Sequence, residues 1–302
     1  MNNYEPVYVY PLTESDGWKE LSGELPVKMT NDYLFRALLQ SDNETLKALT
    51  ASLLHMDQSE ITSAEVTNPI LLGESINDKM YIMDVRIELN KSAMLNLEMQ
   101  VIREEGWEER SLLYMCRMFD RLNRGSVYAS TKPVIQIAIC DFTLFKDYPE
   151  FYATYKLMNT RNNESVYTEK FIISNVNLKR LDLATEEDRK YGLDKWCRLF
   201  KATTWEEVKM IAAEDKTLNK AVSGVWQLTE EERIREQCRA REEWLLMDQW
   251  KTEELAKKDQ VIAEKDQTIA EQDQTITEQD QTIKELQDEL ACYKAKIKPG
   301  TP

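Results

Sequence analysis

Apolar and polar residues alternate along two neighbouring segments of the chain, residues 80–89 and 93–101. Because successive side chains of a strand point to opposite faces, this alternation predicts two β-strands, each with one apolar and one polar face. The turn-forming residues 90–92, Asn-Lys-Ser, separate the two segments. We therefore expect an antiparallel hairpin, the clearest element in the sequence.

The polar face of this hairpin carries carboxylates from both strands. Asp84 lies on it in the first strand, and Glu98 and Gln100 lie on it in the second. A three-residue turn would place Asp84 directly across from Glu98, with their Cβ atoms about 5 Å apart. A divalent cation such as Mg²⁺ would relieve the repulsion between the two carboxylates and could activate water for phosphodiester hydrolysis. The alternative from the pattern alone is a solvated polar face on which Arg86 neutralises Asp84 or Glu88.

Helical spacing dominates the segments on either side of the hairpin. Thr30 and Asn31 offer N-cap oxygens for an amphipathic helix that runs to Leu53. A second helix is expected over residues 107–124, ended by Gly125. The apolar side of this second helix is predicted to consist of Leu112, Met115, Cys116, Phe119 and Leu122.

Further along, residues 133–140 form a nearly all-apolar run, which is typical of a buried strand. Another strand is expected around residues 167–174, and helical patterns prevail from Thr185. The patterns divide the chain into a leader (1–27), an α/β core (28–180), a helical C-terminal subdomain (181–254) and a heptad-repeat tail (255–302).

The tail repeats one seven-residue unit almost unchanged, with isoleucine at every seventh position from Ile262 to Ile283. This period predicts a coiled-coil helix that could form a homodimer. The companion core positions are mostly polar, Lys265, Gln272 and Gln279, with only Leu286 apolar. A solvated helix or an expanded tandem repeat therefore remains open as the alternative.

The formal net charge of −15 argues against indiscriminate binding to nucleic acid or to an anionic membrane. Contact with DNA would need a local basic patch. The single histidine, His55, excludes a three-histidine zinc site, and five scattered cysteines suggest neither a disulfide framework nor a zinc cluster. Residues 1–10 show no export signal and no long apolar run follows, so we expect a cytoplasmic protein without a membrane segment.

The order of Asp84 and then Glu98-Met99-Gln100 resembles the PD-(D/E)XK nuclease superfamily, in the branch where Gln replaces the Lys of the motif. That branch is the recombination-promoting nuclease family, also labelled putative transposase. The likeness extends to Met29-Thr30-Asn31-Asp32-Tyr33-Leu34-Phe35-Arg36, to Lys79, Arg110, Tyr114, Gly125 and Tyr128, and to residues 132–145. It spans roughly residues 28–245.

The resemblance implies an α/β fold with a restriction-endonuclease-like core, a mixed central sheet flanked by helices. It implies that Asp84 and Glu98 bind Mg²⁺ or Mn²⁺, that Gln100 helps to position water or phosphate, and that Asp32 adds an acidic ligand. For Asp32 the alternative is a capping residue, since Asp in a first turn complements the helix dipole. Two departures are that Met83 precedes Asp84 where the superfamily name has Pro, and that Arg36 stands where Lys is commoner.

Four arginines recur along the helix after the hairpin at spacings of seven, four and three: Arg110, Arg117, Arg121 and Arg124. This basic stripe is a candidate for contact with the phosphate backbone of DNA, and the alternative is pairing with Glu108, Glu109 or Asp120.

The sequence thus predicts a Mg²⁺-dependent DNA endonuclease associated with recombination or mobile elements. The alternative is a DNA-binding or assembly protein that keeps the fold but has lost turnover, which the uncharged Gln100 favours. A purely structural coiled-coil adaptor is a third reading. It predicts that function survives Asp84→Ala but not deletion of residues 255–302.

Overall fold

The structure is a computed structural model, and it describes residues 12–13, 15–68, 84–103, 106–120, 127–213 and 215–296. The chain forms two compact units, Met1–Leu245 and Leu246–Pro302. The first unit contains the sheet and the helices that pack on it. The second contains most of the long C-terminal helix. The domain boundaries expected at residues 180 and 254 stay predictions.

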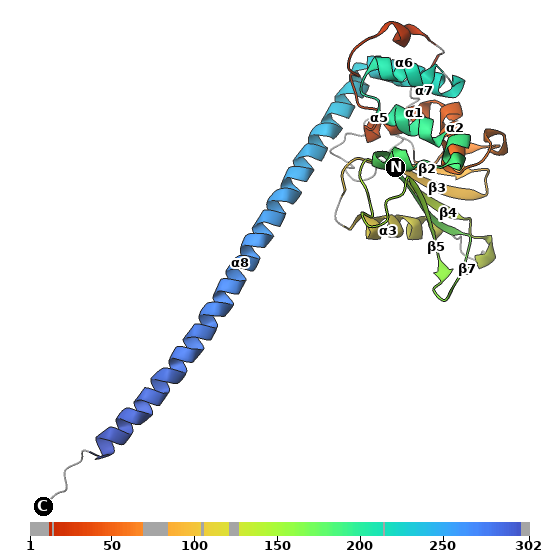
Figure 1. Cartoon of the computed structure of the whole chain (residues 1–302). Coiled ribbons are helices and arrows are strands. Elements are labelled where there is room, and N and C mark those ends of the chain that lie inside the picture. Colours follow the sequence, from red (N-terminus) through yellow and green to blue (C-terminus); the bar gives the residue numbers. More distant parts are fainter. Residues whose placement is uncertain are drawn as a thin grey trace, which may run out of the picture. The chain divides into compact units, whose positions relative to one another are not determined.

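The first unit is built on a mixed six-stranded sheet with the order β1-β2-β3-β4-β8-β5 (Figure 1). Its strands are β1 (Ala64–Val66), β2 (Val85–Leu89), β3 (Ala93–Gln100), β4 (Val134–Cys140), β5 (Tyr152–Lys156) and β8 (Phe171–Asn177). The three central strands β3, β4 and β8 are parallel, and the outer pairings are antiparallel. The strands β6 (Met158–Asn159) and β7 (Asn162–Val166) form a separate ribbon. The predicted α/β class, with helices flanking a mixed sheet, is confirmed.

The hairpin of β2 and β3 has the predicted register. Leu89 pairs with Ala93 across the turn, and Val85 pairs with Leu97 at the far end. The turn residues Asn90 and Lys91 both have positive φ, 50° and 55°, which gives the backbone the sharp reversal that a short hairpin loop needs. The part of the first strand expected at residues 80–83 lies outside the described residues.

Helices cover the two sheet faces unequally (Figure 1). The apolar face of β2, β3 and β4 shares one large core with α1 (Asp32–Ser41), α2 (Asn43–Leu53), α5 (Leu193–Lys201), α6 (Trp205–Ala212) and α7 (Lys216–Glu230). The opposite face is covered by α3 (Trp107–Phe119), whose Met115 and Met118 pack on Met94 and Val134. The remaining helical segments are η1 (Gly17–Glu20), η2 (Gln58–Glu60), η3 (Tyr128–Ser130), η4 (Leu178–Leu183) and α4 (Glu186–Lys190).

The single helix expected from residue 31 to residue 53 was wrong, because the structure has two. Asp42 stands between α1 and α2 with an extended backbone, φ −127° and ψ 101°, and its side chain accepts hydrogen bonds from the Glu44 amide and the Thr45 hydroxyl. It therefore ends one helix and caps the next. Asn31 caps α1 as predicted, by accepting from the amide of Leu34. The strand expected around residues 167–174 begins later, at Phe171.

The predicted apolar side of α3 was right for Met115 and Phe119, which pack in the core, and wrong for Leu112 and Cys116. Leu112 and Cys116 are exposed, and the buried residues of α3 are Trp107, Ser111, Met115 and Met118. The helix ends at Phe119, and residues 121–126 lie outside the described residues. The sheet face that α3 covers is partly polar, so the helix face that meets it does not follow the apolar pattern.

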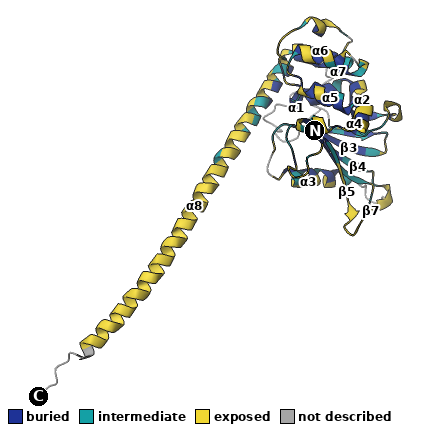
Figure 2. Cartoon of the chain, in the orientation of Figure 1, coloured by how far each residue is buried: buried dark blue, intermediate teal, exposed yellow. Residues whose placement is uncertain are grey.

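The helix α8 runs from Glu232 to Lys296. Its first turns, with Ile234, Cys238 and Arg241, are buried in the first unit, and every side chain from residue 255 to residue 294 is exposed (Figure 2). In the described residues, no helix has the length and apolar character needed to cross a membrane.

Candidate active site

Asp84 lies immediately before β2, at a position held by Asn68. The Asn68 side chain donates to the carbonyl of Asp84 at 3.0 Å and accepts from the amide of Arg86 at 2.7 Å. The carbonyl of Asn68 in turn accepts from the Arg36 guanidinium. Because β2 pairs with β3 as far as Val85, one further step of the register sets Asp84 opposite Glu98, as predicted.

The carboxylate of Asp84 is buried, with only 2 % of the residue exposed. Burial raises the pKa of Asp84, and the charges of Arg86 and Arg36 oppose that rise. Arg86 Nε lies 3.1 Å from Oδ2 of Asp84. The other oxygen, Oδ1, has no hydrogen-bond partner in the described part of the structure. A buried carboxylate oxygen in this state is suited to a cation or to a hydrogen-bond donor.

Glu98 and Gln100 occupy the same face of β3 and are also buried. Arg110, from α3, donates through Nη2 to Oε1 of Glu98 at 2.7 Å and to Oε1 of Gln100 at 3.0 Å. The amide nitrogen of Gln100 donates to the carbonyl of Ile102 at 2.7 Å, which fixes the side-chain orientation. The alternative of a solvated polar face is therefore wrong, although Arg86 does neutralise Asp84 as that reading supposed.

A buried amide pair extends the polar face across the sheet. Asn96 donates to Gln136 of β4 at 2.9 Å, and both residues are fully buried. The nearly apolar run of residues 133–140 did not point to Gln136 as part of this polar face. Its signal was a single polar residue within an apolar run, which a fully buried strand tolerates only where a partner satisfies the side chain.

Asp32 is buried at the first position of α1, but its partner is a cation of the protein. Arg241 of α8 binds both carboxylate oxygens of Asp32. Its Nε donates to Oδ1 at 3.1 Å and to Oδ2 at 2.8 Å, and its Nη2 lies 2.7 Å from Oδ2. The guanidinium also stacks on the ring of Trp244, at 4.5 Å from the ring centroid. Asp32 is not the capping residue of α1, because Asn31 fills that role, but its position in the first turn does complement the helix dipole.

The metal ion that the resemblance implies would need oxygen ligands, chiefly carboxylates, at this site. Within the described residues, no three His, Cys, Asp or Glu side chains lie close enough together to hold a metal. Two buried carboxylates on facing strands, Asp84 and Glu98, with an unsatisfied oxygen on Asp84, still match the preference of Mg²⁺ for one or two carboxylates completed by water and phosphate. The pair fits the ion, and Asp32 is engaged elsewhere.

The comparisons with known proteins agree with this geometry. The model of one family, described as PD-(D/E)XK nuclease family transposase, matches residues 29–254. The chain belongs to this family. No curated protein and no solved structure matches it. Membership in the PD-(D/E)XK nuclease family implies DNA cleavage linked to mobile elements, and nucleases of this family typically use divalent metal ions.

Only part of the predicted basic stripe lies within the described residues of this family member. Arg110 turns toward Glu98 and Gln100, whereas Arg117, two turns later, is exposed. Arg121 and Arg124 lie outside the described residues. The alternative expectation was that the stripe pairs with acidic residues of its own helix. Arg110 does not do so, because its carboxylate partner, Glu98, is on β3.

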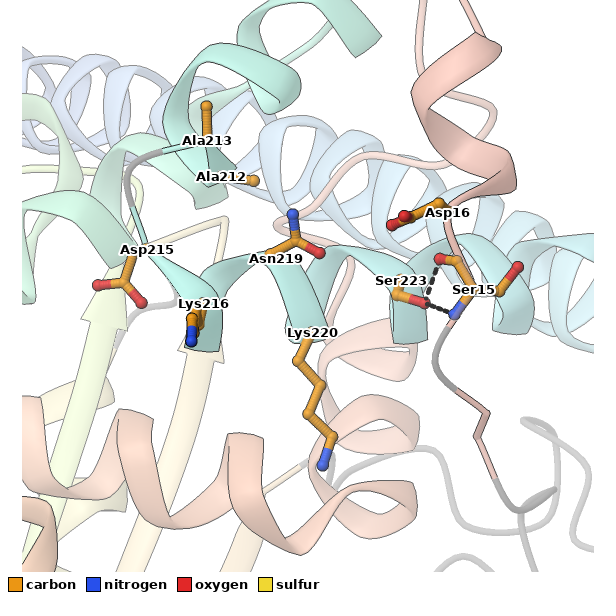
Figure 3. Close-up of a pocket in the computed structure, with 9 residues that line it drawn as sticks. All are labelled: Ser15, Asp16, Ala212, Ala213, Asp215, Lys216, Asn219, Lys220 and Ser223. Carbon is orange, nitrogen blue, oxygen red and sulfur yellow. Dashed lines mark hydrogen bonds between the residues drawn. The ribbon is translucent and has the colours of Figure 1, made fainter.

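A separate hollow of about 590 Å³ opens between η1, α6 and α7 and contains none of the motif residues (Figure 3). Several of its polar groups already have structural partners. Asp215 caps α7 by accepting from the amides of Thr217 and Leu218, and Ser223 donates to the carbonyl of Ser15 at 2.9 Å. The hollow lies where the N-terminal segment packs on α7. The residues of the family motif, Asp84, Glu98 and Gln100, lie instead at the sheet.

Proposed function

We propose that this protein is a Mg²⁺-dependent DNA endonuclease that hydrolyses phosphodiester bonds during recombination or mobile-element events. One observation supports this most directly. Asp84 and Glu98, the two acids of the family motif, are buried on facing strands, and Asp84 keeps one oxygen without a partner in the described part of the structure. Burying two opposed carboxylates costs free energy, so their presence is easier to explain by a bound cation than by stability.

In this proposal Asp84 and Glu98 hold the metal, and Gln100 orients the attacking water or a phosphate oxygen. Bound Mg²⁺ would polarise the phosphodiester and lower the pKa of water. Asp32 can serve as a further metal ligand beside Asp84 and Glu98 only when Arg241 releases its carboxylate. Arg117, together with Arg121 and Arg124, contacts the phosphate backbone and fixes the position of DNA without reading its sequence.

The test is nicking and linearisation of a supercoiled plasmid by the purified full chain with Mg²⁺, with Mn²⁺ and with EDTA. Asp84→Asn and Glu98→Gln keep side-chain shape and are expected to abolish cutting. Glu88→Gln is the matched control, because Glu88 lies on the same strand face as Asp84 but pairs with Lys132 at the surface. Cutting that persists in EDTA, or in both motif variants, would contradict the proposal.

The second candidate is a DNA-binding or assembly protein without turnover. The structure offers one observation in its favour, since Asp32, Asp84 and Glu98 each already have an arginine partner. This candidate predicts a mobility shift of DNA that is equal in EDTA and in Mg²⁺, with no cleavage under either condition. The endonuclease proposal predicts cleavage that requires the metal.

We also propose that the protein is cytoplasmic and that the tail pairs two copies in parallel, which would bring two active sites to one duplex. The exposed Ile262, Ile269, Ile276 and Ile283 supply the seam. Aspartates follow four residues after the first three of these isoleucines, at residues 266, 273 and 280. An antiparallel pair would set these aspartates against one another, whereas a parallel pair sets them against threonines.

A further inference from the structure

The motif of this chain lacks the positive charge that the superfamily usually carries at the position of Gln100. Lys at that position can stabilise an oxyanion, and a neutral amide can only donate hydrogen bonds. The structure brings another cation to the same place. Arg110 Nη2 lies 3.0 Å from Oε1 of Gln100 and 2.7 Å from Oε1 of Glu98.

The reach of Arg110 depends on how α3 is anchored. Gly106, with φ 71°, starts the helix, and Trp107 in its first turn is buried against Ala138 and Cys140 of β4. Arg110 follows Trp107 by three residues, so it projects from nearly the same side of the helix, toward the end of β3. The packing of α3 therefore fixes the position of Arg110, unlike that of a mobile arginine on the surface.

The environment of Arg110 suits an electrostatic role. Its side chain is 22 % exposed, which leaves a path to solvent, and the groups that it contacts are nearly buried. A charge at such a boundary is screened less than a surface charge and remains accessible to a ligand. The sequence pattern groups Arg110 with the basic stripe expected to contact the DNA backbone, but in the structure Arg110 is only partly exposed and Arg117 is exposed.

We propose that Arg110 supplies the positive charge that Gln100 lacks and stabilises the scissile phosphate in the transition state. In that step the oxygen of water bonds to phosphorus, the bond from phosphorus to one ester oxygen breaks, and the departing oxygen gains a proton. The negative charge that grows on the phosphoryl oxygens falls beside the guanidinium. This inference rests on the proposed endonuclease activity and adds a catalytic residue outside the D…ExQ motif.

The experiment moves the charge back to the motif. Arg110→Ala is expected to lower kcat about 100-fold, the usual loss when one group that stabilises transition-state charge is removed, with a smaller effect on KM. Adding Gln100→Lys to the Arg110→Ala variant is expected to raise kcat at least tenfold above that of Arg110→Ala. Arg110→Lys alone should have a kcat between those of the wild type and Arg110→Ala. Arg189→Ala, at an exposed arginine of α4, is the control and should cut like the wild type.

A second readout separates this role from a structural one. Arg110 also neutralises Glu98, so Arg110→Ala should bind Mn²⁺ at least as tightly as the wild type in calorimetry while kcat falls. Loss of Mn²⁺ binding together with kcat, or Arg110→Ala activity within threefold of the wild type, would overturn the inference. So would a folded double variant no faster than Arg110→Ala. A wild type that never cuts would instead reject the endonuclease proposal, and the charge role with it.

Discussion

Arg241 binds both carboxylate oxygens of Asp32 from a position 209 residues further along the chain. The pair joins the first turn of α1 to the first turns of α8. Asp32 belongs to the segment that resembles the opening helix of the nuclease family, and Arg241 lies near the end of the part that the family model matches. The carboxylate of Asp32 is therefore neutralised by an arginine of the helix that continues into the tail.

Removing Arg241 should destabilise the first unit more than removing the charge of Asp32. Arg241→Ala leaves a buried carboxylate without its partner, and such a loss typically costs about 3 kcal/mol or more. Asp32→Asn keeps a hydrogen-bond acceptor for Arg241 and should cost less. Urea denaturation in EDTA, followed by circular dichroism, measures both, with the exposed Arg189→Ala as control. An Arg241→Ala variant as stable as the wild type would show that the pair is not a structural contact.

The hairpin of β2 and β3 could be predicted from the sequence, including its register. Its apolar face is buried in one large core, so a shift of one residue would expose the whole set, and the turn of Asn90 and Lys91 fixes the loop length. Asp84 and Glu98 followed from that register. Their burial did not, because it depends on α3, which covers the polar sheet face from outside the hairpin.

The arginine partners of the motif could not be predicted for a related reason. Arg86 and Arg110 come from β2 and α3, and Arg241 comes from α8, so the constellation exists only after tertiary packing. The face of α3 was misassigned because the sheet beneath it carries Asn96 and Glu98 among apolar residues. A helix that meets such a surface buries Ser111 and leaves Leu112 exposed, which hydrophobic periodicity does not predict.

Asp84→Asn should stabilise the metal-free protein at neutral pH. Burial raises the pKa of Asp84, so the folded chain binds this proton more tightly than the unfolded chain does. The contribution of Asp84 to stability is therefore present at pH values below the unfolded pKa and is lost as the pH rises through the folded pKa. Asparagine has no charge to bury and avoids that loss.

The measurement is the free energy of unfolding of Asp84→Asn and wild type in EDTA, from about pH 8 down to below the ordinary pKa of an aspartate side chain. The advantage of the variant should be largest above the raised pKa of Asp84 and should narrow as the pH falls through it. Glu88→Gln, at a half-buried position on the same face, is the matched control for the loss of one carboxylate. A variant less stable than the wild type at pH 8 would mean that the pairing with Arg86 outweighs the cost of burial.

The thiols should fall into two reactivity classes. Cys116 and Cys292 are exposed, whereas Cys140, Cys197 and Cys238 are buried. Burial raises the pKa of Cys238 to about 12, and raises the pKa of the other two buried thiols as well, so thiolate is scarce at these positions at pH 8. Ellman's reagent should label two thiols quickly and the other three only in denaturant. Cys116→Ser should lower the number of quickly labelled thiols from two to one. An unchanged number would show that the exposed face of α3 is assigned wrongly.

The tail offers a test of pairing that leaves the nuclease core intact. Ile269→Asn with Ile276→Asn removes two of the exposed seam residues, and light scattering of the full chain should then report monomers. Gln272→Leu with Gln279→Leu should have the opposite effect, because leucine is favourable at the second core position of a parallel two-stranded coil.

Orientation can be read from a cysteine placed at the seam. With Cys116 and Cys292 replaced by Ser, Leu290→Cys puts one exposed thiol at the last seam position. A parallel pair brings the two introduced thiols together, so mild oxidation should give a covalent dimer, and an antiparallel pair would keep them a helix length apart. Near-identical repeats allow a shift by whole heptads, which lowers the yield of disulfide without reversing the strands. Monomers in every variant would assign the tail to the solvated helix that its polar companion positions also permit.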